Sequence, residues 1–184
     1  LISQDIGFYP RLIINEIHSD PDIEEGDANG DGKVNTSQDE FVEIVNNGES
    51  SINMGNWILA DNTKNRFLFP SSFILQGYEC VVIFGGGSPQ GTFGHSHVFV
   101  SGGLGLNNSG DIVSLYNHKQ ELIVQEEYDN IGGNDQSITR SPDLTGEFIL
   151  HSQVSENLFS PGTDINGLPF ITSIVLLSEN DTIQ

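Results

Sequence analysis

The sequence predicts an all-β protein built as a β-sandwich of about seven to nine strands. Short runs rich in β-branched and aromatic residues alternate with clusters of Gly, Asn, Asp and Ser, which is the spacing typical of strands and turns. No segment keeps the helical hydrophobic period for about ten residues, so no long helix is expected. The chain of 184 residues, 36% of them hydrophobic, has the size and apolar content of one folded domain.

Nine segments are expected to form strands. They are, in chain order, residues 12–17, 39–45, 56–61, 66–69, 78–84, 96–100, 111–116, 121–128 and 148–150. The fifth segment is almost continuously apolar, so it is expected in the interior of a sheet. Residues 117–120 fit a short hairpin loop. The glycine-rich stretch 85–91 lacks the Lys-Ser/Thr pair and the following helix of a phosphate-binding loop, so no nucleotide site is expected there.

The charge balance excludes several classes of partner. The chain has 6 Lys and Arg against 26 Asp and Glu, a formal net charge of −20. Nucleic acids and anionic membrane surfaces attract basic proteins, so neither is expected as a partner. Divalent cations and basic proteins are compatible with this charge. No apolar run approaches the ~18 residues of a spanning helix, so no membrane insertion is expected.

Residues 12–170 are expected to form the sandwich domain, with residues 1–11 as an N-terminal extension and 171–184 as a C-terminal tail. Residues 171–177 are apolar and would form a last edge strand or the start of a further segment. The chain begins at Leu1 and shows no signal-peptide pattern. We expect a mature or trimmed chain, in which a removed signal peptide would leave no trace, and the location outside the cell or on its surface is expected only from the family resemblance given below.

The sharpest local signal is an acidic loop between the first two predicted strands. Oxygen-bearing side chains recur at alternate positions, at Asp27, Asn29 and Asp31. Gly32 follows where a calcium loop needs a sharp turn, and Lys33 would contribute its backbone carbonyl. Side chains at alternate positions of such a loop can point toward the same centre. Ca²⁺ prefers about six to eight oxygen ligands. The spacing predicts a structural Ca²⁺ site that pins this long loop.

The end of the loop departs from the standard calcium pattern. Gln38 stands at the twelfth position, where such loops carry a bidentate Glu, and Asp39 and Glu40 follow it. Either of these two carboxylates could close the site. No helical pattern flanks the loop, so it does not belong to a paired helix–loop–helix sensor. The competing interpretation is a solvated acidic turn that binds nothing.

No catalytic residue is expected. Cys80 lies in an apolar run and is expected to be a buried thiol. His95 and His97 have the spacing of a zinc pair on one strand face. A third ligand would have to come from the remaining histidines, His18, His118 and His151. All three lie in predicted loops or strand ends, so exposed histidines are the favoured interpretation. Ser, His and Asp occur without the Gly-x-Ser-x-Gly elbow of a hydrolase.

Several motifs follow one another in a recognisable order. They are Ile-Asn-Glu-Ile at 14–17, Asp-Glu-Phe-Val-Glu-Ile-Val-Asn at 39–46, Gly-Asn-Trp-Ile-Leu-Ala-Asp at 55–61, and Leu-Asn-Asn-Ser-Gly-Asp-Ile-Val-Ser-Leu-Tyr at 106–116. In this order and spacing the chain resembles the lamin tail domain, in its bacterial and secreted form. The acidic insertion and the segments 140–143 and 160–162 are also similar to bacterial members. The resemblance covers roughly residues 12–170 and implies an immunoglobulin-like β-sandwich without a catalytic constellation.

The matched residues have physical roles of their own. Trp57 is expected to fill the space between the sheets, because a large aromatic side chain can dominate core energetics. Phe41 and Phe67 are expected to point inward. Gly55 and Gly110 are expected to supply positive φ angles at turns before strands.

Glu16 and Glu43 interrupt apolar strands. Alternation along the strand would turn both side chains to solvent. The alternative is that they are carboxylates near the acidic loop, where Glu16 could join the metal site.

The predicted function is a non-catalytic accessory or interaction module of a secreted or surface bacterial protein, with a calcium-stabilised loop. Its expected partner is a protein or a carbohydrate at the cell surface, and its oligomeric state is open. The alternatives are a structural spacer domain without a ligand and, less favoured, a domain associated with a metal-dependent hydrolase. An exposed apolar or aromatic patch would favour a binding module over a spacer.

Overall fold

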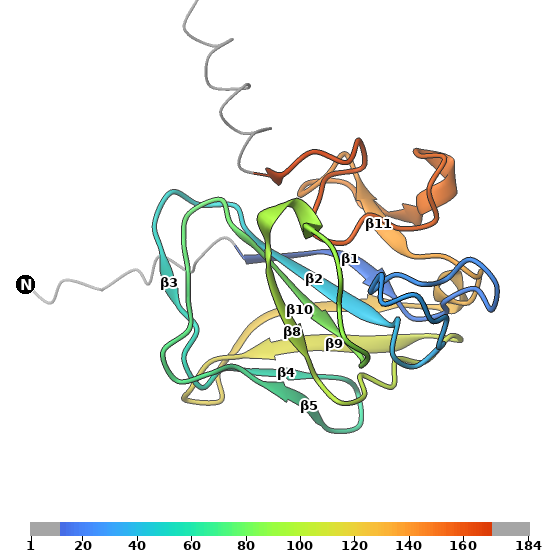
Figure 1. Cartoon of the computed structure of the whole chain (residues 1–184). Helices are drawn as coiled ribbons and strands as arrows, with labels where there is room; N and C mark the ends of the chain where they lie inside the picture. The colour runs from blue at the N-terminus through green and yellow to red at the C-terminus, as the bar shows by residue number, and fades with distance from the viewer. Residues whose placement is uncertain (1–11, 171–184) are drawn as a thin grey trace, which may run out of the picture.

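Two β-sheets pack face to face in the computed structural model, which describes residues 12–170 (Figure 1). The all-β prediction is confirmed. The predicted extension at residues 1–11 and the tail at 171–184, with its apolar run 171–177, lie outside the described residues.

The described residues form twelve strands, three more than the upper end of the predicted range. They are β1 Leu12–His18, β2 Phe41–Asn46, β3 Ile52–Asn53, β4 Ile58–Ala60, β5 Asn65–Leu68, β6 Ile74–Leu75, β7 Cys80–Phe84, β8 His97–Val100, β9 Asp111–Tyr116, β10 Leu122–Tyr128, β11 Ile138–Ser141 and β12 Glu147–Leu150. Within the same part of the chain, three single-turn 3₁₀ helices are present: η1 Phe93–His95, η2 Asn130–Gly132 and η3 His151–Gln153. Each of the nine predicted segments contains a strand, and β3, β6 and β11 are additional.

The strands form one larger and one smaller sheet that face each other (Figure 1). The larger sheet has the order β12-β11-β1-β2-β7-β8, the smaller one β10-β9-β4-β5, and β3 and β6 form a separate ribbon. β7 lies inside the larger sheet, as its apolar sequence predicts; it pairs antiparallel with β2 and parallel with β8. The predicted hairpin joins β9 to β10, where Asn117 N–H donates to Glu121 O at 2.9 Å.

Aliphatic and aromatic side chains fill the space between the two sheets. Trp57 is 6% exposed and packs there with Ile44, Leu59 and Leu115, so its predicted position is confirmed. Phe67 packs against the same core and is partly buried. This core carries the apolar residues that point to one face of each strand, which is how a sandwich buries an alternating sequence.

The other face of the larger sheet is also covered. Phe41 and Phe84 lie on it and are fully buried in a second apolar cluster. The cover comes from the loop after β7, through Phe93, and from the chain after β12, through Phe159 and Phe170. Figure 1 shows this C-terminal part, in orange and red, on the side of the larger sheet away from β4, β5, β9 and β10. Phe41 therefore points inward as predicted, but into this second cluster.

Three smaller predictions have mixed outcomes. Cys80 is buried and free, and burial raises the pKa of its thiol, so it is the buried thiol that was expected. Gly110 has a φ of +124°, as predicted. The prediction for Gly55 is wrong, because the positive φ of that turn falls on Asn56, at 60°. Gly55 is required by a close approach instead, since a Cβ there would lie 2.2 Å from Ser71 O.

Candidate functional site

The acidic loop connects β1 to β2 and is folded by its own side chains. Asp31 N–H donates to Asp27 Oδ1 at 3.1 Å and to Asn29 Oδ1 at 3.0 Å. The second Asp27 oxygen accepts from Gly32 N–H at 2.9 Å. Asp31 Oδ1 accepts from Lys33 N–H at 3.0 Å. The side-chain oxygens of the first three predicted ligands therefore gather around the turn at residues 31–33, where Lys33 itself is exposed.

Asp39 closes the loop. Its Oδ1 accepts from Asn29 N–H at 3.1 Å and its Oδ2 accepts from Asn35 N–H at 2.7 Å. Burial raises the pKa of the Asp39 carboxyl, and the charges of Asp27 and Asp31 add to this rise. The loop therefore concentrates negative charge that a bound cation would stabilise.

Glu40, the second candidate for closing the loop, points elsewhere. Its Oε2 accepts from Gly105 N–H at 2.7 Å and from Leu106 N–H at 3.4 Å, in the segment before β9. Burial raises the pKa of Glu40 to about 7. The structure thus places Asp39 with the loop oxygens and Glu40 apart from them.

The loop is fixed against the glycine-rich segment that follows β7. Gln90 N–H donates to Asn29 O at 2.8 Å, and Ser88 N–H donates to Asp31 Oδ2 at 3.1 Å. A Cβ at Gly87 would lie 2.4 Å from Asn29 Nδ2 and 2.8 Å from Asp31 Oδ2. The glycine-rich stretch therefore serves a close contact with the acidic loop, which the sequence alone did not indicate.

The donor set of the loop fits a hard cation such as Ca²⁺, because it consists of carboxylate and amide oxygens without thiolate or imidazole. Within residues 12–170, no three His, Cys, Asp or Glu side chains come close enough together to hold a metal ion by themselves. Asn29 and main-chain carbonyl oxygens would therefore have to complete the coordination, as they do in calcium loops.

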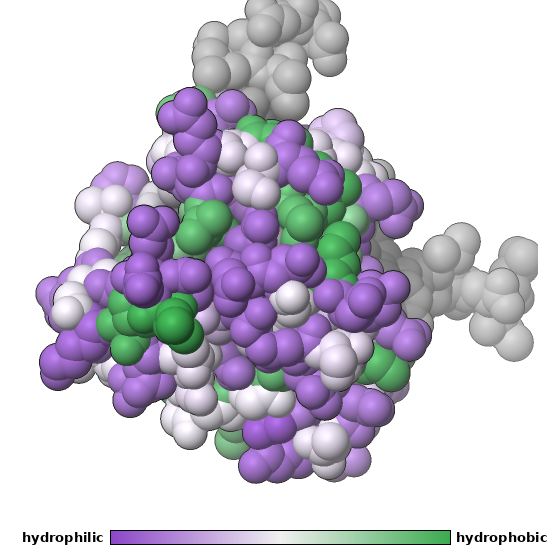
Figure 2. Space-filling view, turned by 90° about the vertical axis from the view of Figure 1, so that its right-hand side faces the viewer, coloured by the Kyte–Doolittle hydropathy of each residue, from purple (hydrophilic) through white to green (hydrophobic). Residues whose placement is uncertain are grey.

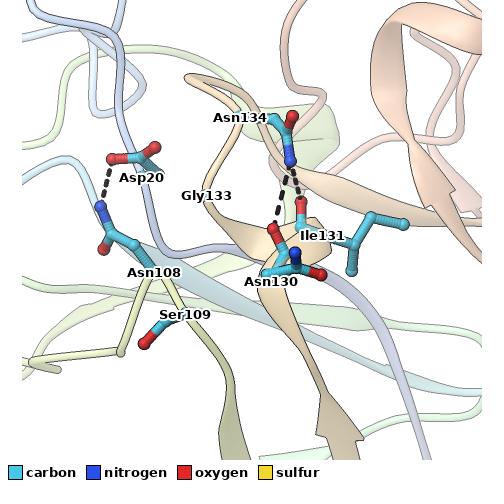
Figure 3. A pocket seen from close by; sticks show the side chains of 7 residues that line it. All are labelled: Asp20, Asn108, Ser109, Asn130, Ile131, Gly133 and Asn134. Atoms are coloured by element: carbon cyan, nitrogen blue, oxygen red, sulfur yellow. Dashed lines mark hydrogen bonds between the residues drawn. The ribbon is translucent and has the colours of Figure 1, made fainter.

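A polar pocket of about 650 Å³ lies beside the start of this loop (Figure 3). Its lining residues are Asp20, Asn108, Ser109, Asn130, Ile131, Gly133 and Asn134. The Asn108 amide donates to the Asp20 carboxylate, and Asn134 Nδ2 donates to the main-chain oxygens of the η2 turn at 2.9 and 3.3 Å (Figure 3). The walls thus offer amide and hydroxyl groups and the Asp20 carboxylate, and this carboxylate makes the pocket better suited to neutral polar ligands than to anions.

A second group of carboxylates is buried beneath the C-terminal part of the chain. Glu16 and Glu43 are fully buried and bond neither to solvent nor to the acidic loop, so both sequence-based alternatives for them are wrong. Glu16 Oε1 accepts from Ser160 N–H at 2.9 Å, and Glu16 Oε2 lies 2.8 Å from Ser160 Oγ. The same hydroxyl lies 2.9 Å from His151 Nε2. The result is a chain of polar contacts from Glu16 through Ser160 to His151.

Glu43 anchors the next stretch of the cover. Its Oε1 accepts from Asn15 Nδ2 at 2.9 Å and its Oε2 accepts from Gly162 N–H at 2.7 Å. A β-bulge between Ile14 and Glu16 shifts the register of β1 against β2. The bulge places Glu16 opposite Glu43, on the face of the sheet away from Ile17, as alternation predicts. The prediction of solvent exposure failed because the C-terminal part of the chain covers that face.

The histidines do not gather into a zinc site. His97 Nε2 lies 3.0 Å from Glu79 Oε2, and His95 and His118 are exposed. His18 and His151 are fully buried, which corrects the expectation that they are exposed. His18 packs against the rings of two phenylalanines of the second cluster, at centroid distances of 5.4 and 5.3 Å.

The side of the molecule that carries the acidic loop is dominated by hydrophilic residues, with separate apolar patches among them (Figure 2). The large hydrophobic side chains exposed in the described residues are aliphatic: Ile23, Val34, Leu68, Ile74, Val100, Leu122 and Leu168. None of the helices in residues 12–170 has the length and apolar content to cross a membrane.

The fold and its loops define an immunoglobulin-like β-sandwich module. The Lamin Tail Domain family matches residues 9–130, well over half of the chain, and the chain therefore belongs to the lamin tail domain family. This family is an immunoglobulin-like, non-enzymatic domain family, which supports an interaction module. No curated protein matches the chain. β11 and β12 lie beyond the matched residues, yet they extend the same sheet as β1 and β2.

Proposed function

We propose that this chain is a non-catalytic accessory module of a secreted or cell-surface bacterial protein, and that Ca²⁺ holds its acidic loop in place. The family supports the interaction module. The observation that carries the calcium part is the convergence of Asp27, Asn29 and Asp31 on one turn, with the Asp39 carboxylate closing the loop behind them.

A cation in this loop would act on structure. Three carboxylates lie near one another in a chain that already carries a net charge of −20, so their mutual repulsion weakens the loop. Binding Ca²⁺ would remove this repulsion and tighten the contact with the segment after β7. It would thereby fix the loop end of the sandwich, where modules of this architecture present their variable surfaces.

The donor set also supports a location outside the cell. The loop lacks the bidentate Glu at its twelfth position, and its closing carboxylate comes one residue later. Sites with fewer strong ligands bind Ca²⁺ weakly, in the range of about 10⁻⁴–10⁻³ M that is typical of extracellular modules. Such a site is filled where millimolar calcium is available.

The test is a thermal melt of metal-stripped protein with and without millimolar calcium, with magnesium as the control ion. With a Kd of about 10⁻⁴–10⁻³ M, calcium at about 10 mM is about 10 to 100 times the Kd and adds about 1.4–2.7 kcal/mol of stability. For a domain of this size that corresponds to a rise in Tm of about 3–11 °C. The rise should be specific to calcium.

Asp31→Asn is the informative variant, because it removes the charge and keeps one of the two acceptor oxygens that bind Lys33 N–H and Ser88 N–H. Glu24→Gln removes an equal charge from an exposed position outside the ligand set and is its matched control. The calcium-dependent rise should be clearly smaller in Asp31→Asn, which has one charged ligand fewer, and should persist in Glu24→Gln. Equal responses in both variants, or no response of the unmodified protein, would show that the loop is a plain acidic turn.

A further inference from the structure

We propose that the groove between the acidic loop and the C-terminal part of the chain binds a basic segment of a partner protein. An arginine side chain of that segment would lie against Phe93 and Phe159, with its charge facing Glu25 and Glu156. This inference rests on the proposed role as an interaction module and names its kind of partner.

The groove is formed where three distant segments meet. It has a volume of about 520 Å³, and its walls come from the acidic loop, from η1 and from residues 156–167. Phe93, Leu158, Phe159 and Pro161 supply apolar surface, and both phenylalanines are only partly buried. An open apolar surface between loops is where a peptide side chain can dock.

Close backbone and ring contacts fix the walls of the groove. A Cβ at Gly94 would lie 2.1 Å from Gly162 O, so the two backbones touch directly. Ser96 Oγ donates to the same Gly162 oxygen at 3.0 Å. The ring of Phe93 packs on the Phe84 ring at 5.3 Å. A site whose walls are fixed in this way loses little entropy on binding.

The charge of the groove selects the partner. Glu25 and Glu156 are exposed on its walls, and its described lining contains no Lys, Arg or His. Asp22 Oδ1 accepts from Glu24 N–H and Glu25 N–H, both at 2.7 Å, which fixes the turn that presents the Glu25 side chain. The net charge of −20 also attracts cationic segments from a distance.

Arginine fits this chemistry better than lysine. Its planar guanidinium stacks on aromatic faces and still donates hydrogen bonds at its edge to carboxylates. A cation–π contact at an exposed site is worth about 0.5–1 kcal/mol, which is about two- to fivefold in affinity, and arginine makes such contacts more often than lysine. An apolar groove with aromatic walls and acidic edges offers both contacts at once.

The experiment measures fluorescence anisotropy of a labelled peptide of alternating Arg and Ser, titrated with the full chain at physiological salt. The same peptide with citrulline in place of arginine, and one with lysine, are run in parallel. The combined Glu25→Gln and Glu156→Gln variant should weaken binding about tenfold. Glu49→Gln combined with Glu121→Gln removes two exposed charges outside the groove and should change affinity less than about twofold.

Phe159→Leu tests the aromatic wall while keeping apolar volume. It should weaken binding of the arginine peptide by about two- to fivefold and weaken binding of the lysine peptide less, because Phe93 remains as the second aromatic wall. Equal losses in the two double variants would mean that the peptide senses only the general negative field, and the proposal would be wrong. Absence of peptide binding to the unmodified chain would also overturn it.

A second copy of the chain is the competing occupant. If sedimentation shows a dimer that dissociates in Phe159→Leu, the groove belongs to self-association and the proposal fails. The calcium melt and the peptide titration report on different residues, so failure of one does not decide the other. Measuring the peptide with and without calcium keeps the two results separate.

Discussion

Glu16 and Glu43 occupy opposite positions in the β1–β2 register, and both side chains are completely buried. Two neighbouring carboxyls in an apolar setting cannot both ionise without a large electrostatic cost. The folded protein therefore keeps a proton on this pair under conditions where the unfolded chain has released it. Since the same pair binds Ser160 and Gly162, the C-terminal cover is attached to the sheet through titratable groups.

Replacing Glu16 with Gln is expected to stabilise the protein at alkaline pH. Burial raises the pKa of Glu16, and burial together with the charge of Glu16 raises that of Glu43 well above 4.5. Above pH 4.5 the folded state binds more protons than the unfolded chain, so stability falls as the pH rises through the folded pKa values. An amide at position 16 can donate to Ser160 Oγ, and its oxygen can still accept from Ser160 N–H.

Urea denaturation at about pH 5 and about pH 9 measures this effect: between these two pH values the unfolding free energy should fall less in Glu16→Gln than in the unmodified protein. Some slope will persist, because Glu40, with a pKa of about 7, loses stability in the same window. Glu16→Ala is the contrast, since it leaves the buried Ser160 N–H without its acceptor and should destabilise at every pH. An unchanged pH slope in Glu16→Gln would contradict the assignment.

His18→Leu is expected to reduce the loss of stability in acid. Burial lowers the pKa of His18 from 6.5 to about 3. Between these values the unfolded chain binds a proton that the folded protein excludes, so stability is lost as the pH falls below 6.5. Leu keeps apolar contact with Phe41 and Phe159 and has no proton to bind. Melting temperatures between about pH 4 and 7 test this, and parallel curves for the two proteins would refute it.

Trp57→Ala is expected to cost about 3–5 kcal/mol of unfolding free energy, because it removes a large side chain from the space between the sheets. Denaturant unfolding followed by circular dichroism measures the loss. Leu68→Ala is the control, since Leu68 is 60% exposed and should cost far less. Similar losses in the two variants would mean that Trp57 is not part of the packed core.

Comparing Gly162→Ala with Gly102→Ala distinguishes two costs of adding a side chain: the steric contact with neighbouring backbone and the strain of a positive φ angle. The two glycines have nearly equal φ angles of +83° and +80°, so the strain of a side chain in the left-handed region is shared. At Gly162 the new Cβ would also lie 2.1 Å from Phe93 O, whereas at Gly102 it meets nothing within 4 Å. Gly162→Ala should therefore be less stable than Gly102→Ala by about 1–3 kcal/mol in thermal or urea unfolding. Equal stability would show that the contact with Phe93 is easily relaxed.

The sandwich could be predicted because its strands carry local signals. Residues 80–84 and 111–116 have apolar runs or alternation that a strand requires, and β7 and β9 form there. β11 has a single aliphatic residue, Ile138, followed by Thr, Arg and Ser, so no alternation marks it. It becomes a strand because it pairs with β1 and β12, a relationship that no local pattern contains.

The candidate sites could also be predicted only where the signal is local in the sequence. The grouping of Asp27, Asn29 and Asp31 follows from spacing along a tight loop. The choice between Asp39 and Glu40 depends on amides that Gly105 brings from another part of the chain, so spacing could not make it. The burial of Glu43 could have been predicted from the sequence of β2. Large apolar residues occur on both faces of this strand, which indicates that both faces are buried.

The pairing of the first strand with β11 also sets the order of events during synthesis. Ser137, at the start of that region, bonds to Glu16 across a separation of 121 residues. At translation rates of about 5–20 residues per second, roughly 6–24 s pass between the emergence of these two residues from the ribosome. Until then one edge of β1 has no partner strand and Glu16 is not covered. The nascent chain is therefore most exposed to strand pairing with other molecules during this interval.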